Sequence, residues 1–268
     1  METRTAQNAL SLAPAGDFAL PQNHLLRSLP QLEWERLRPL MQPVTLTARR
    51  VLQHAGVPIE HVYFIEEGLV SVLASADEKG AVEVWLIGHE GLAGSAALLG
   101  VRVSPLRHFV QIGGSALRIG VEDLERALPQ MPGLRSALNN YLHGVLLQSA
   151  QAAACSLTHS LRQRLARWLL MAQDRSERDA LPITQDLLAR SLGVRRATVS
   201  EALKPLVSDG IFARERGLIK ILDRARLEEF ACRCYRLMRP KNGSGNGRSR
   251  LYALSAFLAL IEMELLAH

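Results

Sequence analysis

The stretch ITQDLLARSLGVRRATVSEALKPLVSDGI, residues 183 to 211, carries two short helical patterns separated by one glycine. Thr184 precedes the first pattern and suits an N-cap, because its hydroxyl can accept a hydrogen bond from an exposed backbone N–H. Gly193 ends that pattern, since glycine adopts the left-handed conformation without strain. A second helix is expected from Arg195 or Arg196 onward. The apolar positions that would form a shared core are Leu188, Ala189, Leu192, Val194, Val199 and Ala202. The stretch therefore predicts a helix-turn-helix.

In such a unit the first residues of the second helix face the base edges of a DNA major groove. Arg196 is the best candidate for a bidentate contact to guanine. Glu201 could accept from a cytosine amino group, orient Arg196 or reject like charge. Backbone amides at the start of the first helix suit phosphates. The predicted DNA-binding residues here are Thr184, Gln185, Arg195, Arg196, Thr198, Ser200, Glu201 and Lys204. Pro205 lacks an N–H and predicts a kink or an early end of the second helix.

Two short strands are predicted between residues 210 and 222, around the turn Arg214-Glu215-Arg216-Gly217. They form a wing whose Arg214 and Arg216 are expected near the duplex backbone. Asp223 is expected to cap a closing helix.

The charge of the chain is concentrated in the segment that carries this motif. The 268 residues have a net charge of +6, and residues 157 to 240 hold 17 Lys and Arg against 10 Asp and Glu, whereas residues 1 to 156 hold 12 against 14. A basic segment suits a polyanionic partner, although a solvated basic face would have the same composition.

The N-terminal half has a different period. Short β-branched or alternating runs such as HVYFI, LVSVLAS, AVEVWLI and RHFVQI lie between Val44 and Ile119, separated by glycine turns. Seven or eight such strands predict an antiparallel β-roll of the cupin-like jelly-roll kind, preceded by short helices broken at Pro30 and Pro39.

A long helix is predicted after Pro132, running to about Cys155, and an amphipathic helix over residues 157 to 173 follows it. The long helix has a seven-residue spacing at Leu138, Val145 and Ala152, which suits pairing with a second copy. Packing of that seam onto its own roll is the alternative.

The predicted fold class is α+β: an antiparallel β-roll, a long dimerisation helix and a winged helix-turn-helix. The expected domains are a flexible leader over 1–21, the roll over 22–131, the dimerisation helix over 132–156, the DNA-binding domain over 157–238, and a linker with an apolar tail over 239–268. The apolar run of this tail is shorter than the ~20 residues that a membrane-spanning helix needs.

Cysteine usage indicates a reducing compartment, and the cytoplasm is expected. Cys155, Cys232 and Cys234 are too few for a disulfide scaffold, and Cys232-x-Cys234 is a weak metal motif because a second ligand pair at zinc spacing is missing. Neither a metal site nor a cofactor is predicted. The histidines in or beside the roll are scattered with no paired spacing: His54, His61, His89 and His108.

The order of these parts resembles the Crp/Fnr family of bacterial transcription regulators. The resemblance covers about residues 22 to 238 and is carried by residues 183 to 211, with HVYFIEEGLVSVL and GHEGLAGSAALLG in the roll. It implies a homodimer on a two-fold symmetric DNA site, an effector bound in the roll, and RNA polymerase as a candidate further partner.

The chain departs from the family pattern in the roll. Members that bind cyclic nucleotides carry Gly-Glu and an Arg-Ser or Arg-Thr pair, whereas this chain has Gly94-Ser95 and, further on, Arg107-His108. An effector other than cyclic AMP is therefore expected, with these four residues as the candidate pocket. An N-terminal iron–sulfur cluster is excluded because no cysteine precedes Cys155.

Two other function classes stay open from sequence. The chain could be an allosteric module in which the helical hairpin binds protein, or an enzyme built on a cupin-like roll. The enzyme is disfavoured because the metal-binding His-x-His pattern, a Ser/His/Asp set and a glycine-rich phosphate loop are all missing.

Overall fold

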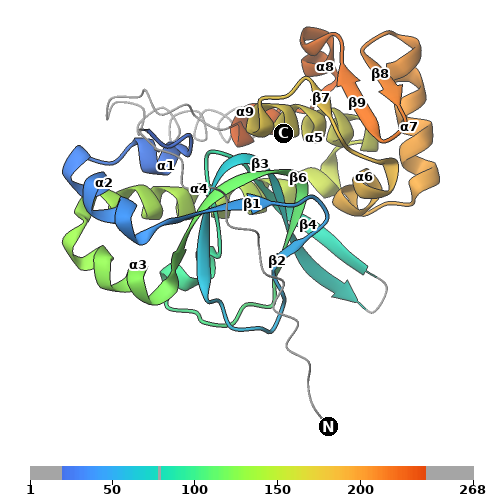
Figure 1. Ribbon diagram of the computed structural model, residues 1–268. Coiled ribbons are helices and arrows are strands. Elements are labelled where there is room, and N and C mark those ends of the chain that lie inside the picture. The colour runs from blue at the N-terminus through green and yellow to red at the C-terminus, as the bar shows by residue number, and fades with distance from the viewer. Residues whose placement is uncertain (1–19, 78–79, 240–268) are drawn as a thin grey trace, which may run out of the picture.

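The computed structural model describes residues 20–77 and 80–239. A β-roll with short helices at one end joins a smaller helical domain through one long helix (Figure 1). This arrangement confirms the predicted α+β fold. The predicted leader and tail lie almost wholly outside the described residues.

The roll is a six-stranded antiparallel sheet. Its strands are β1 (Gln42–Leu46), β2 (Val51–Gln53), β3 (His61–Asp77), β4 (Gly80–Ile87), β5 (Leu92–Ala93) and β6 (Arg107–Gly120). The order is β1-β6-β3-β4, with β2 also paired to β6 and β5 to β3. The helical pieces at one end are α1 (His24–Arg27), α2 (Gln31–Leu37), η1 (Arg38–Leu40), η2 (Ser95–Leu99), α3 (Val121–Ala127) and η3 (Leu128–Gln130).

The prediction of seven or eight short strands was wrong, because two glycine-containing turns are bends inside long strands. Runs expected to be separate are joined in β3 through Gly68 and in β6 through Gly113-Gly114. Gly68 has φ +98°, and a Cβ there would overlap the Ile112 carbonyl of the neighbouring strand. Glycine therefore lets both strands shift register and bend together without ending their pairing.

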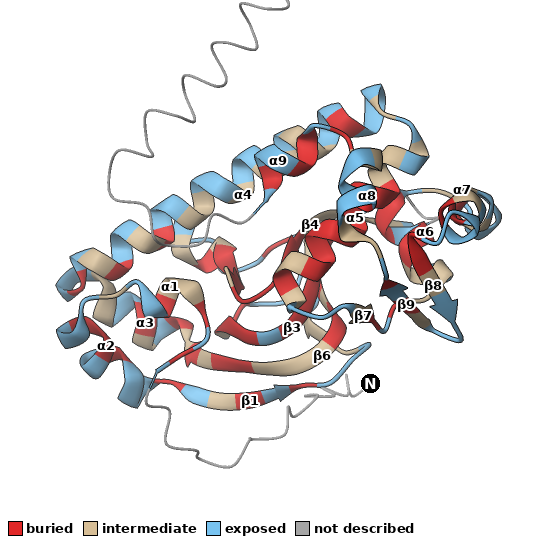
Figure 2. Cartoon of the chain, turned by 90° about the horizontal axis from the view of Figure 1, so that it is seen from above, coloured by how far each residue is buried: buried red, intermediate tan, exposed pale blue. Residues whose placement is uncertain are grey.

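Helix α4 (Pro132–Thr158) continues three residues beyond the predicted end at Cys155, and its faces are turned differently. The expected pairing seam faces the chain itself: Leu138 is buried, and Ala152 packs against the core. The apolar side chains that α4 exposes are others: Leu146 is 69% exposed, Leu147 54% and Leu157 87%. Ala150, Ala153 and Ala154 are exposed too, and their helical spacing puts them on the same side as these leucines. Figure 2 shows the pale blue, exposed segments along α4.

The C-terminal domain begins with α5 (Leu161–Ser176), whose Ser160 and Gln163 form a capping box. The helix-turn-helix is α6 (Gln185–Leu192) and α7 (Arg196–Ser208). The wing is β8 (Phe212–Glu215) and β9 (Leu218–Ile221), with β7 (Ala180–Leu181) added to its edge. Helices α8 (Arg224–Phe230) and α9 (Cys234–Met238) close the domain. The early end predicted at Pro205 was wrong, since α7 continues to Ser208 with Leu203 and Leu206 buried on either side of the proline.

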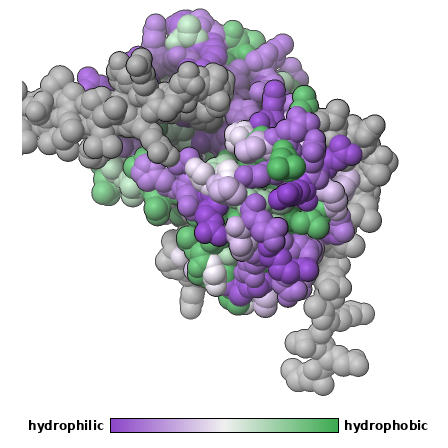
Figure 3. Space-filling view, turned by 90° about the vertical axis from the view of Figure 1, so that its left-hand side faces the viewer, coloured by the Kyte–Doolittle hydropathy of each residue, from purple (hydrophilic) through white to green (hydrophobic). Residues whose placement is uncertain are grey.

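A continuous core joins the two domains. The largest buried cluster holds most of the apolar side chains of the C-terminal domain and also Leu69, Leu86 and Ile112 of the roll. The face shown in Figure 3 is mostly hydrophilic, with apolar residues scattered in small groups. Among the described residues, no helix combines the length and the apolar character needed to cross a membrane.

Candidate nucleic-acid interface

The turn between α6 and α7 is built by one glycine and one cap. Gly193 has φ +66° and ψ +36°, and its N–H donates to Arg190 O at 3.3 Å while Val194 N–H donates to Ala189 O at 3.0 Å. At the other end of α6, Thr184 Oγ1 accepts from Leu187 N at 3.3 Å, which confirms the predicted N-cap. These bonds satisfy helix-end groups that would otherwise lack partners.

A buried set of aliphatic side chains fixes the second helix against the first. Leu188, Leu192, Val199 and Leu203 are each at most 3% exposed, and Ala189 is 6% exposed. Ala202, expected in this core, is half-buried and packs at its edge. Because one side of α7 is held in this way, its opposite side is presented to solvent.

The exposed side of α7 carries the predicted base-reading residues at its N-terminal end. Arg195, Arg196 and Thr198 are exposed, while Ser200 is half-buried. Arg196 Nε lies 3.6 Å from Asp186 Oδ1 of α6, and both side chains are more than half exposed. An exposed pair of this kind contributes little stability, so Arg196 is free to exchange this partner for another.

Two predicted residues pair with each other. Lys204 Nζ donates to Glu201 Oε1 at 2.7 Å, so Glu201 does not orient Arg196 in this structure. Asp186, in the first turn of α6, takes that position instead.

The two wing arginines are exposed, Arg214 within β8 and Arg216 in the turn beside Gly217, which has φ +77°. Their predicted place near a duplex backbone stays a prediction. Gln185, predicted to meet phosphate, is half-buried, and its Nε2 has no hydrogen-bond partner among the described residues. The structure thus brings the wing and the α7 end into one domain, while leaving Thr184 and Gln185 partly covered.

The C-terminal domain contacts the roll through the carboxyl group of Glu83. Glu83 of β4 accepts from Trp168 Nε1 of α5 at 2.6 Å and from Ser191 Oγ of α6 at 3.0 Å. Ser71 and Gln111 donate to the same carboxyl from inside the roll. Burial raises the pKa of Glu83, and the hydrogen bonds from Ser71, Trp168 and Ser191 oppose that shift.

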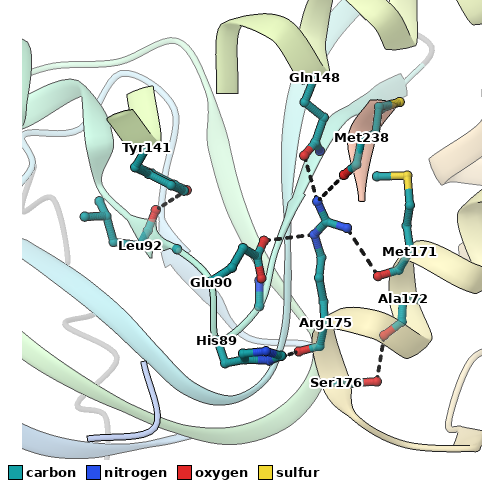
Figure 4. A network of polar contacts seen from close by, with 12 residues as sticks. His89, Glu90, Leu92, Tyr141, Gln148, Met171, Ala172, Arg175, Ser176 and Met238 are labelled. Atoms are coloured by element: carbon teal, nitrogen blue, oxygen red, sulfur yellow. Dashed lines mark hydrogen bonds and ion pairs between the residues drawn. The ribbon is translucent and has the colours of Figure 1, made fainter. Parts of the chain in front are cut away.

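A second contact between the domains centres on Arg175, which is shown in Figure 4. Its Nε donates to Glu90 Oε1 at 2.8 Å and its Nη2 to Gln148 Oε1 of α4 at 2.8 Å. The Arg175 side chain is 2% exposed and that of Glu90 16%. His89 lies beside them, with Nδ1 2.8 Å from Arg175 O. One guanidinium therefore joins the roll, α4 and the DNA-binding domain.

The sequence did not reveal either contact. Glu83 stands in an alternating strand pattern and Arg175 near the end of an amphipathic helix, where both residue types are ordinarily solvated. A charged residue on an otherwise apolar strand face was the available signal for Glu83, and it is a weak one.

The four candidate effector residues lie near one another but are largely occupied by internal contacts. Gly94 N–H donates to His108 Nδ1 at 3.2 Å, and Ser95 and His108 are 8% and 4% exposed. Burial lowers the pKa of His108 to about 4, so the ring is neutral. Arg107 Nε is buried without a hydrogen-bond partner among the described residues. A separate cavity of about 210 Å³ lies between the domains, lined by polar residues that include Glu66, His89 and Glu177.

Known proteins share this architecture. Residues 163–230 match the family described as Crp-like helix-turn-helix domain. The transcriptional regulator SdrP of Thermus thermophilus is 27% identical over 200 residues, which cover 71% of this chain and 94% of SdrP. The structure of TTHA1359, a transcriptional regulator of the CRP/FNR family from the same organism, is 25% identical with a TM-score of 0.56, covering 70% of this chain and 97% of that one. FixK2 from Bradyrhizobium japonicum has a TM-score of 0.62 at 18% identity, covering 72% of this chain and 98% of FixK2.

Proposed function

Since the chain belongs to the Crp/Fnr family of transcription regulators and carries its helix-turn-helix domain, we propose that it binds a two-fold symmetric DNA operator as a homodimer. The observation that carries this proposal is the orientation of α7, whose buried side holds Val199 and Leu203 while Arg195 and Arg196 are exposed at its N-terminal end. An exposed N-terminal end is the part of a recognition helix that meets base edges.

The contacts divide by chemistry. Arg196 has the fork of donors that matches guanine O6 and N7, and Thr198 is short enough to meet a base or a phosphate. Arg214 and Arg216 of the wing suit the phosphate backbone, which would make binding salt-dependent. Because Glu201 pairs with Lys204, we assign this pair to the edge of the interface.

The homodimer is supported by the exposed apolar side of α4. Leu146, Leu147 and Leu157 are each more than half exposed, and alanines lie between them. Small residues between leucines let two helices approach closely, and burying this side against a second copy removes apolar area from water. Pairing through α4 would place two DNA-binding domains about a two-fold axis, as a symmetric operator requires.

We assign the roll an effector other than cyclic AMP. Gly94 N–H donates to His108 Nδ1 in the segment that, by the resemblance, would hold a nucleotide phosphate, and an acidic residue does not follow Gly94. Arg107, with its buried and unpaired Nε, suits a small anionic effector. A chromosomal target implies the cytoplasm. RNA polymerase stays a prediction as a partner.

The proposal is tested on the full-length reduced protein. Duplexes are selected from a random pool, and the affinity of the enriched duplex is then measured by fluorescence anisotropy as a function of salt. We expect an inverted-repeat sequence and an affinity that falls steeply as salt rises. Arg196→Ala should weaken binding to the enriched duplex by about 1–3 kcal/mol and relax its base preference.

Arg126→Ala is the matched control, because Arg126 is an exposed arginine on α3 of the roll. It should bind like the wild type. Enrichment of no sequence, or an Arg196→Ala protein that binds the enriched duplex as tightly and as selectively as the wild type, would contradict the proposal and favour the alternative in which the helical hairpin binds protein.

A further inference from the structure

Four metal-ligating side chains meet at the junction between the long helix and the DNA-binding domain. The ligand atoms of Cys155, His159, Cys232 and Cys234 all lie within 4.8 Å of one another. Cys155 is in the last turn of α4, and His159 is the residue that ends this helix. Cys232 precedes α9, and Cys234 is its first residue. The cluster thus joins segments about 75 residues apart in the chain.

The spacing of these atoms fits one tetrahedral ion. Cys155 Sγ lies 3.4 Å from Cys232 Sγ, and Cys234 Sγ lies 3.6 Å from His159 Nδ1. Metal bonds of about 2.3 Å to sulfur and 2.0–2.1 Å to nitrogen at tetrahedral angles give about 3.8 Å between sulfurs and about 3.6 Å between sulfur and nitrogen. A disulfide needs about 2.05 Å between sulfurs, and the three cysteines are free thiols.

The chemistry of the ligands selects the metal. Three thiolates and one imidazole form a complete four-coordinate set of the kind that holds structural Zn²⁺. Ca²⁺ and Mg²⁺ require oxygen ligands, and carboxylates are missing from this set. The cysteines are buried and His159 is half-buried, so such a site would leave little room for a bound water.

The surroundings carry the opposite charge to such a centre. Zn²⁺ with three thiolates and a neutral imidazole has a net charge of −1. Arg167 is only 7% exposed and donates from Nη1 to the sulfurs of Met171 and Met238, and half-buried Arg164 donates from Nη2 to Leu192 O. Within the described part of the chain neither forms an ion pair with a carboxylate, although the charge of Arg167 acts on Glu83, and the Nε atoms of both are buried without a hydrogen bond. A buried guanidinium requires a nearby anion or acceptor.

One further contact acts on the thiols themselves. Gln151 Nε2 donates to Cys234 Sγ at 3.1 Å, which is the kind of outer contact that orients a ligand.

We propose that Cys155, His159 Nδ1, Cys232 and Cys234 bind one structural Zn²⁺ ion. Binding forms three Zn–S bonds and one Zn–N bond, releases the remaining thiol protons to solvent, and transfers no electron. The ion ties α9 to the end of α4 beside the Thr158–Ser160 connection, and so fixes how the DNA-binding domain follows the dimerisation helix. This inference does not depend on the effector or on the DNA sequence.

The test measures the metal before it measures DNA binding. The full-length chain is purified under reducing conditions without chelator, and its metal content is determined by mass spectrometry. We expect one Zn²⁺ per chain. After removal of zinc, Co²⁺ should restore an intense visible absorption typical of a tetrahedral thiolate site.

Losing a residue that only contacts a ligand weakens metal binding by up to about 100-fold. Cys232→Ser and Cys234→Ser remove a ligand itself and should therefore weaken metal binding by more than about 100-fold. His54→Ala is the control, because His54 is an exposed histidine of the roll, and it should keep one equivalent. Should the cysteine variants fail to fold, the cobalt spectrum of the wild type decides alone.

Three results would overturn the proposal. The first is a folded protein with far less than one equivalent of metal and three thiols that react freely. The second is a Cys155–Cys232 disulfide as the native form. The third is one equivalent of iron or copper in place of zinc.

Discussion

Replacing Arg175 with methionine should lower the free energy of unfolding and weaken the coupling between the two domains. The guanidinium is 2% exposed and makes its ion pair with Glu90 of the roll, and it also reaches Gln148 of α4 (Figure 4). Methionine keeps the apolar stem but removes every donor. Glu90 would then keep the Gly88 N–H, 3.1 Å away, as its remaining hydrogen-bond donor within the described residues.

The expected loss is large because a buried charge would be left without its partner. Removing one member of a buried ion pair costs about 3–5 kcal/mol, and most of that cost is the stranded charge. Glu90→Gln leaves the remaining charge better paired, because Arg175 keeps Gln148 Oε1 and the carbonyl oxygens of Met171 and Met238, both at 3.4 Å, as acceptors. We therefore expect about 2 kcal/mol for Glu90→Gln, comparable to one hydrogen bond to a charged group. The double variant should lose less than the sum by about 1.5–3 kcal/mol.

Urea unfolding followed by circular dichroism and tryptophan fluorescence measures these differences at fixed protein and metal concentration. Because the pair spans both domains, Arg175→Met should also split one transition into two. Arg126→Met, at the exposed pair with Asp123, is the control and should cost less than about 1 kcal/mol. A change below about 1 kcal/mol in Arg175→Met, or additive losses in the double variant, would refute the reasoning.

Two further predictions concern the roll and the long helix. His108 has a folded-state pKa of about 4 against an ordinary 6.5, so its neutral ring contributes stability that is complete above pH 6.5 and is lost as pH falls toward 4, by roughly 3 kcal/mol. Unfolding curves across this range should show a loss that is larger in the wild type than in His108→Gln, which keeps an acceptor for Gly94, by that amount; equal losses in the two proteins would contradict the assignment. Leu147→Glu puts a charge on the exposed side of α4 and should shift the protein from dimer to monomer in sedimentation experiments while the monomer stays folded, because the side chain is 54% exposed. Arg135→Glu, exposed in the first turns of the same helix, should remain dimeric, and a dimeric Leu147→Glu protein would place the interface elsewhere.

Features set by neighbours along the chain were predictable from sequence. The Thr184 cap, the Gly193 turn and the Asp223 cap are each made by residues within a few positions, so their residue types alone indicate them. The same holds for most of α4, whose helical period indicated a helix from Pro132 to about Cys155, three residues short of its end at Thr158.

Where the sequence offered several equivalent patterns, it did not predict which of them the fold uses. The sequence offered several apolar rows along α4, and the row containing Leu138 and Ala152 turned inward only because the roll and the C-terminal domain pack there. Gly68 reads as a turn from sequence, and only its close approach to Ile112 shows that β3 bends and continues.

The sequence by itself determined the helix-turn-helix and its wing, because their caps, turns and small core are local. The tertiary structure decided which distant polar groups meet: Glu83 with Trp168, Glu90 with Arg175, and Cys155 and His159 with Cys232 and Cys234. Such meetings depend on how whole elements pack, and the spacing of residues within one segment carries no information about a partner from another. Cys232-x-Cys234 was a weak motif by itself, because the two residues that complete the set, Cys155 and His159, lie more than 70 residues earlier in the chain.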